Sequence, residues 1–280
     1  MPSPSKVQVF GGKGFVGSAF VKKCKDNGIN CIVNDRDDYK VKEHDIVYMI
    51  STVSNYNVKT DPYIDIDTNL TILMKVLEQC KNNSNITFNF ISSWFVYGET
   101  EMPAHEESNC YPNGFYSITK RCAEQLLISY CETFGIKYRI LRLANVAGYG
   151  DKKASPQKNA LQHMINELKA GRDVNVYDGG NLYRDYIHVN DAARAIKLIM
   201  EKGEVNTTYN VGNGQPLLFK DMIEYAKELI GGEGKLVPIE IPDFHRTVQV
   251  RSMWMLSDKL KSLGYTPNYD MKAIIEDMVK

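Results

Sequence analysis

The segment Gly11-Gly-Lys-Gly-Phe-Val-Gly17 constrains the fold of this chain more than any other. It follows the apolar run Val7–Phe10 and opens a helical pattern over Gly14–Asn27. Glycines spaced as G-x-G-x-x-G or G-x-x-G-x-x-G permit a tight turn, close backbone approach to a pyrophosphate, and close packing of helix on strand. The free N–H groups at the start of such a helix attract phosphate. The residues predicted to contact a bound dinucleotide here are Gly11, Lys13, Gly14, Phe15, Val16 and Gly17.

The choice between NAD and NADP depends on three charged residues. Asp35 closes the second predicted strand, where a carboxylate can accept both ribose hydroxyls and its charge repels a 2′-phosphate. Arg36 follows it directly, and Lys13 lies inside the glycine loop; either cation could bind that phosphate. We therefore predict NAD as the cofactor and keep NADP as the alternative.

Short apolar runs alternate with longer helical patterns through the first half of the chain. The runs are rich in Val, Ile, Phe and Tyr, and the predicted buried strands are Val7–Phe10, Cys31–Asn34, Ile46–Ile50, Thr87–Ile91 and Tyr138–Leu143. The helical patterns cover Gly14–Asn27, Ile64–Lys81 and Phe115–Phe134. This alternation predicts the α/β class, with a Rossmann-type doubly wound parallel sheet and right-handed crossovers.

The second half of the chain is less regular. Helices are predicted at Gln157–Ala170, Val189–Met200, Phe219–Ile230 and Met271–Val279, separated by loops that carry Gly and Pro. We expect a smaller C-terminal α/β lobe that caps the crevice where doubly wound folds bind ligands. The predicted division assigns 1–147 and 186–204 to the dinucleotide-binding lobe, and 148–185 and 205–280 to the substrate-binding lobe.

Three side chains suggest chemistry at that crevice. Tyr116 and Lys120 lie four residues apart at the start of a helical pattern, so they share one helix face. Ser93 follows a strand and can face the same space. A phenol with a pKa of ~10 is a poor base at neutral pH, but a nearby ammonium favours the phenolate. A serine hydroxyl can hold a sugar oxygen while Tyr116 exchanges its proton and a nicotinamide exchanges hydride.

These motifs resemble those of the extended short-chain dehydrogenase/reductases, in the nucleotide-sugar epimerase/dehydratase group. The likeness covers nearly the whole chain and rests on Gly11–Gly17, Asp65-Ile-Asp-Thr-Asn69, Ser92-Ser93 with Val96-Tyr-Gly98, Tyr116 with Lys120, Arg142-Leu-Ala-Asn145, Tyr183-Arg-Asp-Tyr-Ile-His-Val-Asn-Asp191 and Arg246. It implies a catalytic triad of Ser93, Tyr116 and Lys120, the last two also touching the cofactor. It further implies that Asn69 lies near the active site, between helix and cofactor.

The resemblance also assigns the substrate side. The residues expected to contact substrate are Ser93, Trp94, Asn145, Arg184 and Arg246. The last three fall where family members bind a nucleotide diphosphate, and two arginines can form paired hydrogen bonds with phosphate oxygens. For Arg184 the alternative is a surface salt bridge with neighbouring Asp185. The predicted partner is a nucleotide-diphosphate sugar.

Two departures from the family pattern narrow the range of possible reactions. In the 4,6-dehydratases of the family, an Asp-Glu pair follows the residue that corresponds to Ser93. Here Trp94 and Phe95 stand there, and neither can transfer a proton, so 4,6-dehydration is disfavoured. In addition, nine residues separate Asp35 from Asp45, where relatives carry another strand and helix. A trimmed adenine side favours a cofactor that exchanges on each turnover, as in the 4-keto-sugar reductases.

Oxidation or reduction of a hexose carbon, C4, on a nucleotide sugar is therefore the predicted activity. Reduction of a 4-keto sugar and 4-epimerisation are close alternatives. A non-catalytic dinucleotide sensor or scaffold of the same fold is the alternative from another class. Such proteins typically lose the Tyr/Lys pair, whereas this chain keeps Tyr116 and Lys120.

Composition bounds the partners and the compartment. Lys+Arg and Asp+Glu both number 34, so the charge balance gives no case for nucleic acid or an anionic membrane. No apolar stretch approaches the roughly 20 residues that span a bilayer, and the polar start Met1–Lys6 is not that of a signal peptide. The six cysteines lack metal-ligand spacing, so no metal site is expected. We expect a cytoplasmic protein and, by the resemblance, a homodimer paired through Ile64–Lys81 and Phe115–Phe134.

Overall fold

The computed structural model describes residues 6–151 and 154–280, so residues 1–5, which carry most of the polar start, lie outside it. A six-stranded sheet has the order β10-β5-β4-β3-β1-β2, and every pairing in it is parallel. Its strands are β1 (Lys6–Phe10), β2 (Asn30–Val33), β3 (Asp45–Tyr48), β4 (Thr87–Ser93), β5 (Lys137–Leu143) and β10 (Thr207–Val211). The predicted Rossmann-type parallel sheet is confirmed.

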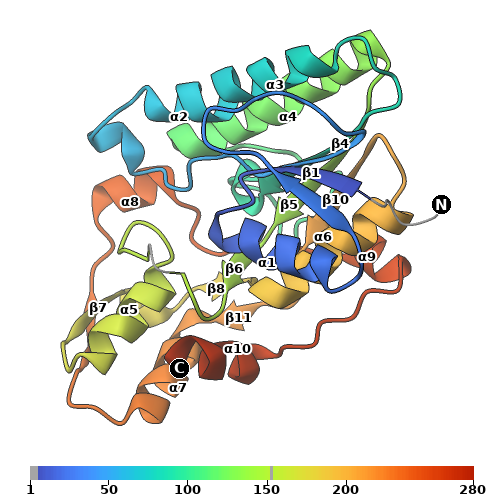
Figure 1. The fold of residues 1–280 in the computed structure, drawn as a ribbon. Coiled ribbons are helices and arrows are strands. Elements are labelled where there is room, and N and C mark those ends of the chain that lie inside the picture. Colours follow the sequence, from blue (N-terminus) through green and yellow to red (C-terminus); the bar gives the residue numbers. More distant parts are fainter. Residues whose placement is uncertain (1–5, 152–153) are drawn as a thin grey trace.

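Helices cover both faces of this sheet (Figure 1). On one face α1 (Phe15–Lys25) packs against α6 (Val189–Lys202), and on the other α3 (Ile72–Cys80) lies beside α4 (Phe115–Phe134). The chain after β1 returns over the first face and the chain after β3 returns over the second. The switch point, where such folds bind ligands, is therefore between the carboxyl ends of β1 and β3. No helix in the described ranges is long and apolar enough to cross a membrane.

The link between β2 and β3 is short, as the spacing of Asp35 and Asp45 predicts. Residues 34–44 contain no helix or strand. They carry the chain from β2, at the edge of the sheet, to β3 on the far side of β1. The adenine side of the expected cofactor site is correspondingly simple.

The helical pattern over Ile64–Lys81 forms three segments in the structure. A single turn, α2 (Ile64–Ile66), leads into a π-helical stretch, η2 (Asp67–Thr71), and then into α3. Such π turns are frequent at functional sites. Asp65 and Asn69, one on each side of the junction, are both buried.

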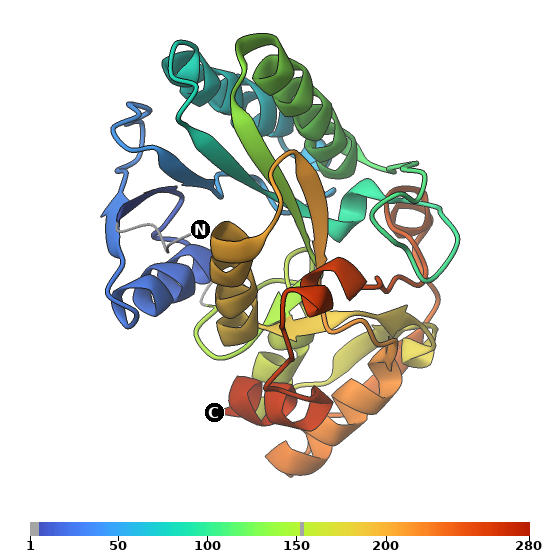
Figure 2. The ribbon, with the colours of Figure 1, turned by 90° about the vertical axis from the view of Figure 1, so that its right-hand side faces the viewer.

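The second half builds a smaller lobe with its own apolar core. Figures 1 and 2 show it on the opposite side of the molecule from α3 and α4. Its main elements are α5 (Ala160–Lys169), α7 (Phe219–Ile230), α10 (Met271–Val279) and the parallel pair β7 (Val174–Tyr177) and β12 (Leu236–Ile239). The remaining short elements are η1 (Asn57–Lys59), η3 (Trp94–Val96), β6 (Asn145–Ala147), η4 (Asp178–Gly180), β8 (Tyr183–Arg184), β9 (Tyr186–His188), β11 (Leu217–Leu218), α8 (Asp243–Val248) and α9 (Asp258–Ser262).

The expected division between the lobes needs one correction. Residues 207–211, which we assigned to the smaller lobe, form β10 and pair with β5 in the main sheet. The segment Thr-Thr-Tyr-Asn-Val is partly polar, so it lacks the apolar pattern of the other strands. Buried residues between 250 and 265 also join the core beneath α1 and α6. We propose a smaller lobe made of 148–185, 212–249 and 266–280.

Candidate active site

The glycine loop between β1 and α1 lies at the switch point of the sheet. Gly11 has a φ of +81°, and a Cβ added there would stand 3.0 Å from the carbonyl carbon of Met49, just after β3. A Cβ on Gly17 would stand 2.3 Å from the Gly11 carbonyl oxygen. The Gly14 N–H donates to that same oxygen at 3.1 Å. The loop thus packs the first turn of α1 against the end of β1, a geometry that suits a pyrophosphate at the helix N-terminus.

Lys13 and Asp35 form an ion pair at the edge of this loop. Their side chains are 72% and 78% exposed, and Arg36 beside them is exposed as well. The two residues that favour different cofactors are therefore in contact with each other. Because exposed pairs of this kind are weak, either partner can turn to a ribose or a phosphate.

The three predicted catalytic residues meet at the carboxyl end of β4. Ser93 is the last residue of that strand, while Tyr116 and Lys120 lie on successive turns at the start of α4. The hydroxyls of Ser93 and Ser51 lie close enough to the Tyr116 phenol to lower its pKa. The Lys120 ammonium donates to the Ile91 carbonyl oxygen at 2.8 Å. The predicted shared helix face is confirmed.

Burial sets the protonation of this pair. It raises the pKa of Tyr116, with the nearby hydroxyls of Ser93 and Ser51 acting against it. It lowers the pKa of Lys120 to about 7, against the attraction of the Glu124 carboxylate. Desolvation disfavours both the phenolate and the ammonium. Lys120 therefore titrates near neutral pH while the phenol keeps its proton, so burial works against the expected stabilisation of the phenolate by a nearby ammonium.

Asn69 lies beside this pair, with its amide engaged inside the protein. Its nitrogen donates to the hydroxyls of Thr52 and Thr119, both at 2.9 Å. Its oxygen accepts from the Thr52 N–H at 3.0 Å and from the Ser51 hydroxyl at 3.1 Å. Asn69 thus ties the π turn η2 to α4 and to the loop after β3. Direct contact with a cofactor remains a prediction.

A buried ion pair that the sequence reasoning missed lies beneath the predicted catalytic residues. The Arg142 guanidinium donates to both carboxylate oxygens of Glu124, at 3.0 and 2.8 Å. The hydroxyl of Ser92, next to Ser93, donates to Glu124 at 2.6 Å. Glu124 lies one turn after Lys120 on the buried face of α4. The sequence signal for this ion pair was the carboxylate of Glu124, four residues after Lys120 in the same helical pattern.

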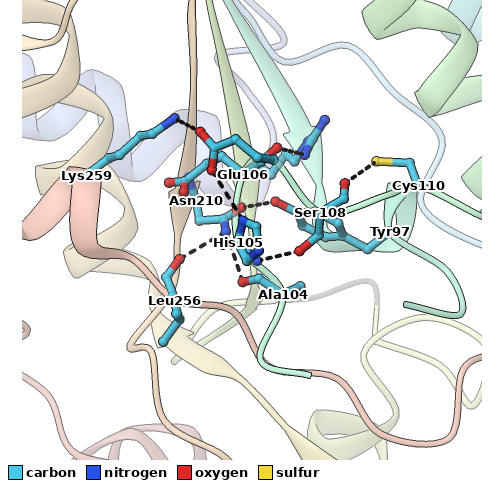
Figure 3. Close-up of polar contacts among 11 residues, drawn as sticks. Tyr97, Ala104, His105, Glu106, Ser108, Cys110, Asn210, Leu256 and Lys259 are labelled. Atoms are coloured by element: carbon cyan, nitrogen blue, oxygen red, sulfur yellow. Dashed lines mark hydrogen bonds and ion pairs between the residues drawn. The ribbon is translucent and has the colours of Figure 1, made fainter. Parts of the chain in front are cut away.

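A polar loop joins η3 to α4 and is fixed to β10 (Figure 3). The Glu106 carboxylate accepts the Asn210 N–H at 2.9 Å, and its backbone carbonyl accepts from Arg142 at 3.1 Å. Lys259, in α9, forms an ion pair with Glu107. These contacts connect the loop to the buried Arg142–Glu124 pair and hold it against the C-terminal segment.

A cavity of about 840 Å³ lies on the smaller-lobe side and is lined by both predicted phosphate-binding arginines, Arg184 and Arg246. Arg184 donates to the backbone carbonyls of Tyr183 and Val250, both at 2.9 Å, and burial lowers its pKa to about 10. Its neighbour Asp185 instead accepts the backbone N–H groups of residues 213 and 214, so the alternative of an Arg184–Asp185 salt bridge is wrong.

Of the other predicted substrate residues, Trp94 lies next to a cavity-lining arginine, while Asn145 does not line the cavity. Trp94 is buried, and its ring lies 5.5 Å from the Arg184 guanidinium. The Arg246 side chain is 58% exposed on α8. Asn145 donates to the Asp185 carbonyl at 3.0 Å and does not line the cavity, so a direct role in binding diphosphate remains a prediction.

Aromatic rings occupy the positions where the dehydratases carry their acidic pair. Trp94 and Phe95 stack with centroids 4.0 Å apart. Phe95 also meets the Tyr116 ring edge-on at 5.6 Å. The two rings thus pack against the core and form an apolar wall beside the Tyr116 phenol.

The sequence analysis assigned no role to His245, which also lines the cavity. Its Nδ1 is 2.6 Å from the Tyr56 hydroxyl, and its ring packs against Tyr177. Burial, with the nearby Arg184 charge, lowers the pKa of His245 to about 4. A neutral histidine therefore joins α8 to the loop before η1.

Known proteins match this chain over most of its length. The family model described as "NAD dependent epimerase/dehydratase family" matches residues 7–212. A putative UDP-glucose 4-epimerase of Methanocaldococcus jannaschii is 26% identical, over 98% of this chain and 97% of that protein. The UDP-N-acetylglucosamine 4-epimerase from Methanobrevibacter ruminantium, solved with UDP-N-acetylmuramic acid, has a TM-score of 0.86 at 23% identity, with 99% of both chains covered. RMD from Pseudomonas aeruginosa, solved with NADPH, has a TM-score of 0.83 at 22% identity, with 98% of both covered.

Proposed function

Because the chain belongs to the NAD dependent epimerase/dehydratase family, we propose that it oxidises or reduces C4 of the hexose in a nucleotide-diphosphate sugar. The observation that carries this proposal is the meeting of Ser93, Tyr116 and Lys120 at the end of β4, beside the glycine loop. The 4-epimerase activity named for the Methanocaldococcus jannaschii relative, which aligns over nearly both whole chains, supports it.

Each residue has a stated task in this reaction. The bound nicotinamide supplies or accepts hydride. The Ser93 hydroxyl holds the sugar oxygen, and Tyr116 gives a proton to that oxygen or takes one from it. Lys120 restores the Tyr116 proton. Arg184 and Arg246 bind the diphosphate with charge-assisted hydrogen bonds.

For the cofactor, we propose NAD, with NADP as the alternative. Asp35 can accept the ribose hydroxyls, and its pairing with Lys13 leaves a cation within reach of a 2′-phosphate. Solved relatives differ in the same way, since a UDP-glucose 4-epimerase of Thermus thermophilus is in complex with NAD and RMD with NADPH. All six cysteines are free, which fits our proposal of a cytoplasmic enzyme.

A second candidate within this chemistry is reduction of a 4-keto sugar. The short, helix-free link over residues 34–44 favours it, because a simple adenine side suits a cofactor that leaves after each turnover. Protein that is purified with NAD already bound would instead support 4-epimerisation. A sensor without catalytic activity would not need the Tyr116–Lys120 pair.

A thermal-shift panel tests the proposed ligands. UDP-, GDP- and dTDP-hexoses should be added singly, each with NAD and with NADP. The matching pair is expected to raise Tm by mass action, equivalent to about 2.7 kcal/mol at one hundred times Kd. Arg184→Ala should abolish the nucleotide-sugar shift, whereas Arg172→Ala, at an exposed ion pair with Glu167, should retain it. An equal shift in both variants would contradict the assignment of Arg184.

We also propose a homodimer paired through the helical segments over residues 64–81 (α2, η2 and α3) and α4. Large apolar side chains are exposed along α2 and α4: Ile64, Ile66, Phe115, Ile118 and Leu126. Large exposed apolar side chains gathered on one face are typical of protein interfaces. Ile118→Asp is expected to turn a sedimenting dimer into a monomer, while Leu229→Asp, at an exposed leucine of α7, should leave it dimeric. A wild-type protein that sediments as a monomer would contradict the pairing.

A further inference from the structure

The helix that carries Tyr116 begins after a residue that cannot cap it. The N-cap of α4 is Gly114, and the first N–H groups of a helix have no partner within the helix. The Asn55 side chain, from the loop after β3, takes the place of a cap, because its Oδ1 accepts the Ser117 N–H at 3.0 Å. Capping asparagines usually bond this third N–H of their own helix. A Cβ on Gly114 would stand 2.6 Å from Asn55 Cγ, so the glycine leaves the room that this remote cap needs.

The other end of the same amide contacts the wall of the cavity. Asn55 Nδ2 donates to the Val248 carbonyl oxygen at 2.8 Å. Val248 is the last residue of α8, two residues after Arg246, and Gln249 and Val250 continue the lining of the cavity. Figure 1 shows α8 next to the start of α4. One side chain therefore joins the helix that carries Arg246 to the first turn of α4.

Burial fixes the orientation of this amide. Asn55 has no exposed surface, and Ser117 and Val248 are buried as well. If the amide were turned over, its NH2 group would face the Ser117 N–H and its oxygen would face the Val248 carbonyl, and buried polar groups without partners are costly. The Ser117 hydroxyl, 2.9 Å from Asn55 Nδ2, adds a further contact. Because Ser117 follows Tyr116 directly, a displacement of α8 reaches the turn from which the phenol projects.

We propose that Asn55 is a positioning residue through which a nucleotide bound in the cavity fixes the first turn of α4, and with it Tyr116. This inference rests on the proposed function. The Arg246 side chain is 58% exposed, so it is available to a diphosphate, and binding one restricts the motion of α8. The restriction passes through the Val248 carbonyl and the Asn55 amide to the Ser117 N–H. The nucleotide, remote from the reacting sugar carbon, thus helps to place the acid–base group.

Hydrogen exchange measured by mass spectrometry tests this link without turnover. UDP, GDP and dTDP are added singly to the protein in saturating NAD, and the peptide that covers the first turn of α4 is followed. The nucleotide that binds wild type should slow exchange there by at least about fivefold, the low end of coupling between sites. In Asn55→Ala the nucleotide should still bind, because Tyr56 holds His245 in α8, but exchange in that turn should no longer respond. Asp270→Ala, which removes the cap of α10, should respond as wild type does.

Asn55→Asp separates positioning from capping. At pH 8 the introduced carboxyl group is ionised, so it keeps an oxygen for the Ser117 N–H but cannot donate to the Val248 carbonyl. Exchange in nucleotide-free α4 should therefore return to the wild-type rate, whereas the response to nucleotide should stay absent. With the nucleotide sugar that wild type turns over, kcat should stay reduced, by up to about 100-fold, while KM stays near wild type. A residue that only caps the helix would be replaced by aspartate in all of these measurements.

The outcomes separate this inference from the proposed function. Nucleotide binding without slower exchange in wild type, or a wild-type response in Asn55→Ala, overturns the inference and leaves the proposed function in place. If Asn55→Ala does not fold, a wild-type response in Asn55→Asp overturns it. A wild-type protein that binds none of the three nucleotides overturns the proposed function and this inference together.

Discussion

Replacement of Tyr116 by phenylalanine is expected to lower turnover by about 10²- to 10⁴-fold, the range for loss of a general acid–base group. The substitution removes the phenol oxygen and keeps the ring that packs against Phe95. Folding and dinucleotide affinity should therefore stay close to wild type. Steady-state assays with the nucleotide sugar selected by thermal shift, together with NAD titrations, measure both quantities.

Tyr130→Phe is the matched control for this prediction. Tyr130 lies on the same helix, away from the catalytic residues, where its ring packs against Phe134. Its loss of a hydroxyl should leave turnover unchanged. Equal turnover in Tyr116→Phe and Tyr130→Phe would contradict the assignment of Tyr116 as the acid–base group.

Replacement of Glu124 by glutamine is expected to destabilise the protein by about 3–5 kcal/mol, the cost of leaving a buried charge without its partner. Arg142 would keep its guanidinium in the core, facing a neutral amide in place of the carboxylate that now accepts two of its hydrogen bonds. Urea denaturation followed by circular dichroism measures the change. Glu132→Gln, at an exposed position of the same helix, should change the free energy of unfolding by less than about 0.5 kcal/mol.

The pKa of Glu124 determines how the stability difference between wild type and Glu124→Gln should change with pH. Burial opposes ionisation of Glu124, but Arg142 and the hydrogen bonds hold the pKa of its carboxyl below the ordinary 4.5. Its contribution to stability is therefore fully present above pH 4.5 and is lost as the pH falls through the folded-state pKa. The difference between wild type and Glu124→Gln should shrink on acidification. A difference that is small at pH 7, or that grows toward low pH, would contradict the role of the ion pair.

Local patterns carried the successful sequence predictions. The glycine spacing between an apolar strand and a helix fixed the position of the dinucleotide loop, because backbone approach there leaves no room for a Cβ on Gly11 or Gly17. The four-residue spacing of Tyr116 and Lys120 placed both on one face of α4, since helical geometry alone determines that arrangement. The short spacing between Asp35 and Asp45 likewise predicted that no helix lies between β2 and β3.

Features set by distant contacts were not predictable in the same way. Strand β10 is partly polar and is recognisable as a strand only through its pairing with β5. In the sequence, Glu124 is one carboxylate among others in a helical pattern. Its ion pair with Arg142 forms only because the fold brings β5 against α4. Asp65 was visible within a motif, but its burial against Thr52 depends on how the π turn packs. In each case a partner far along the chain determines the role.

The hydrogen on C4 of the sugar gives the most direct test of the central claim. Nucleotide hexoses and 6-deoxyhexoses deuterated at C4 should be incubated with the protein and NAD or NADP, then followed by NMR and mass spectrometry. The account predicts that, for the matching sugar, deuterium moves to the nicotinamide ring or returns to C4 with inverted configuration, and that Tyr116→Phe stops the transfer. Deuterium that stays on C4 in its original configuration for every sugar, or exchange at another carbon alone, would contradict it.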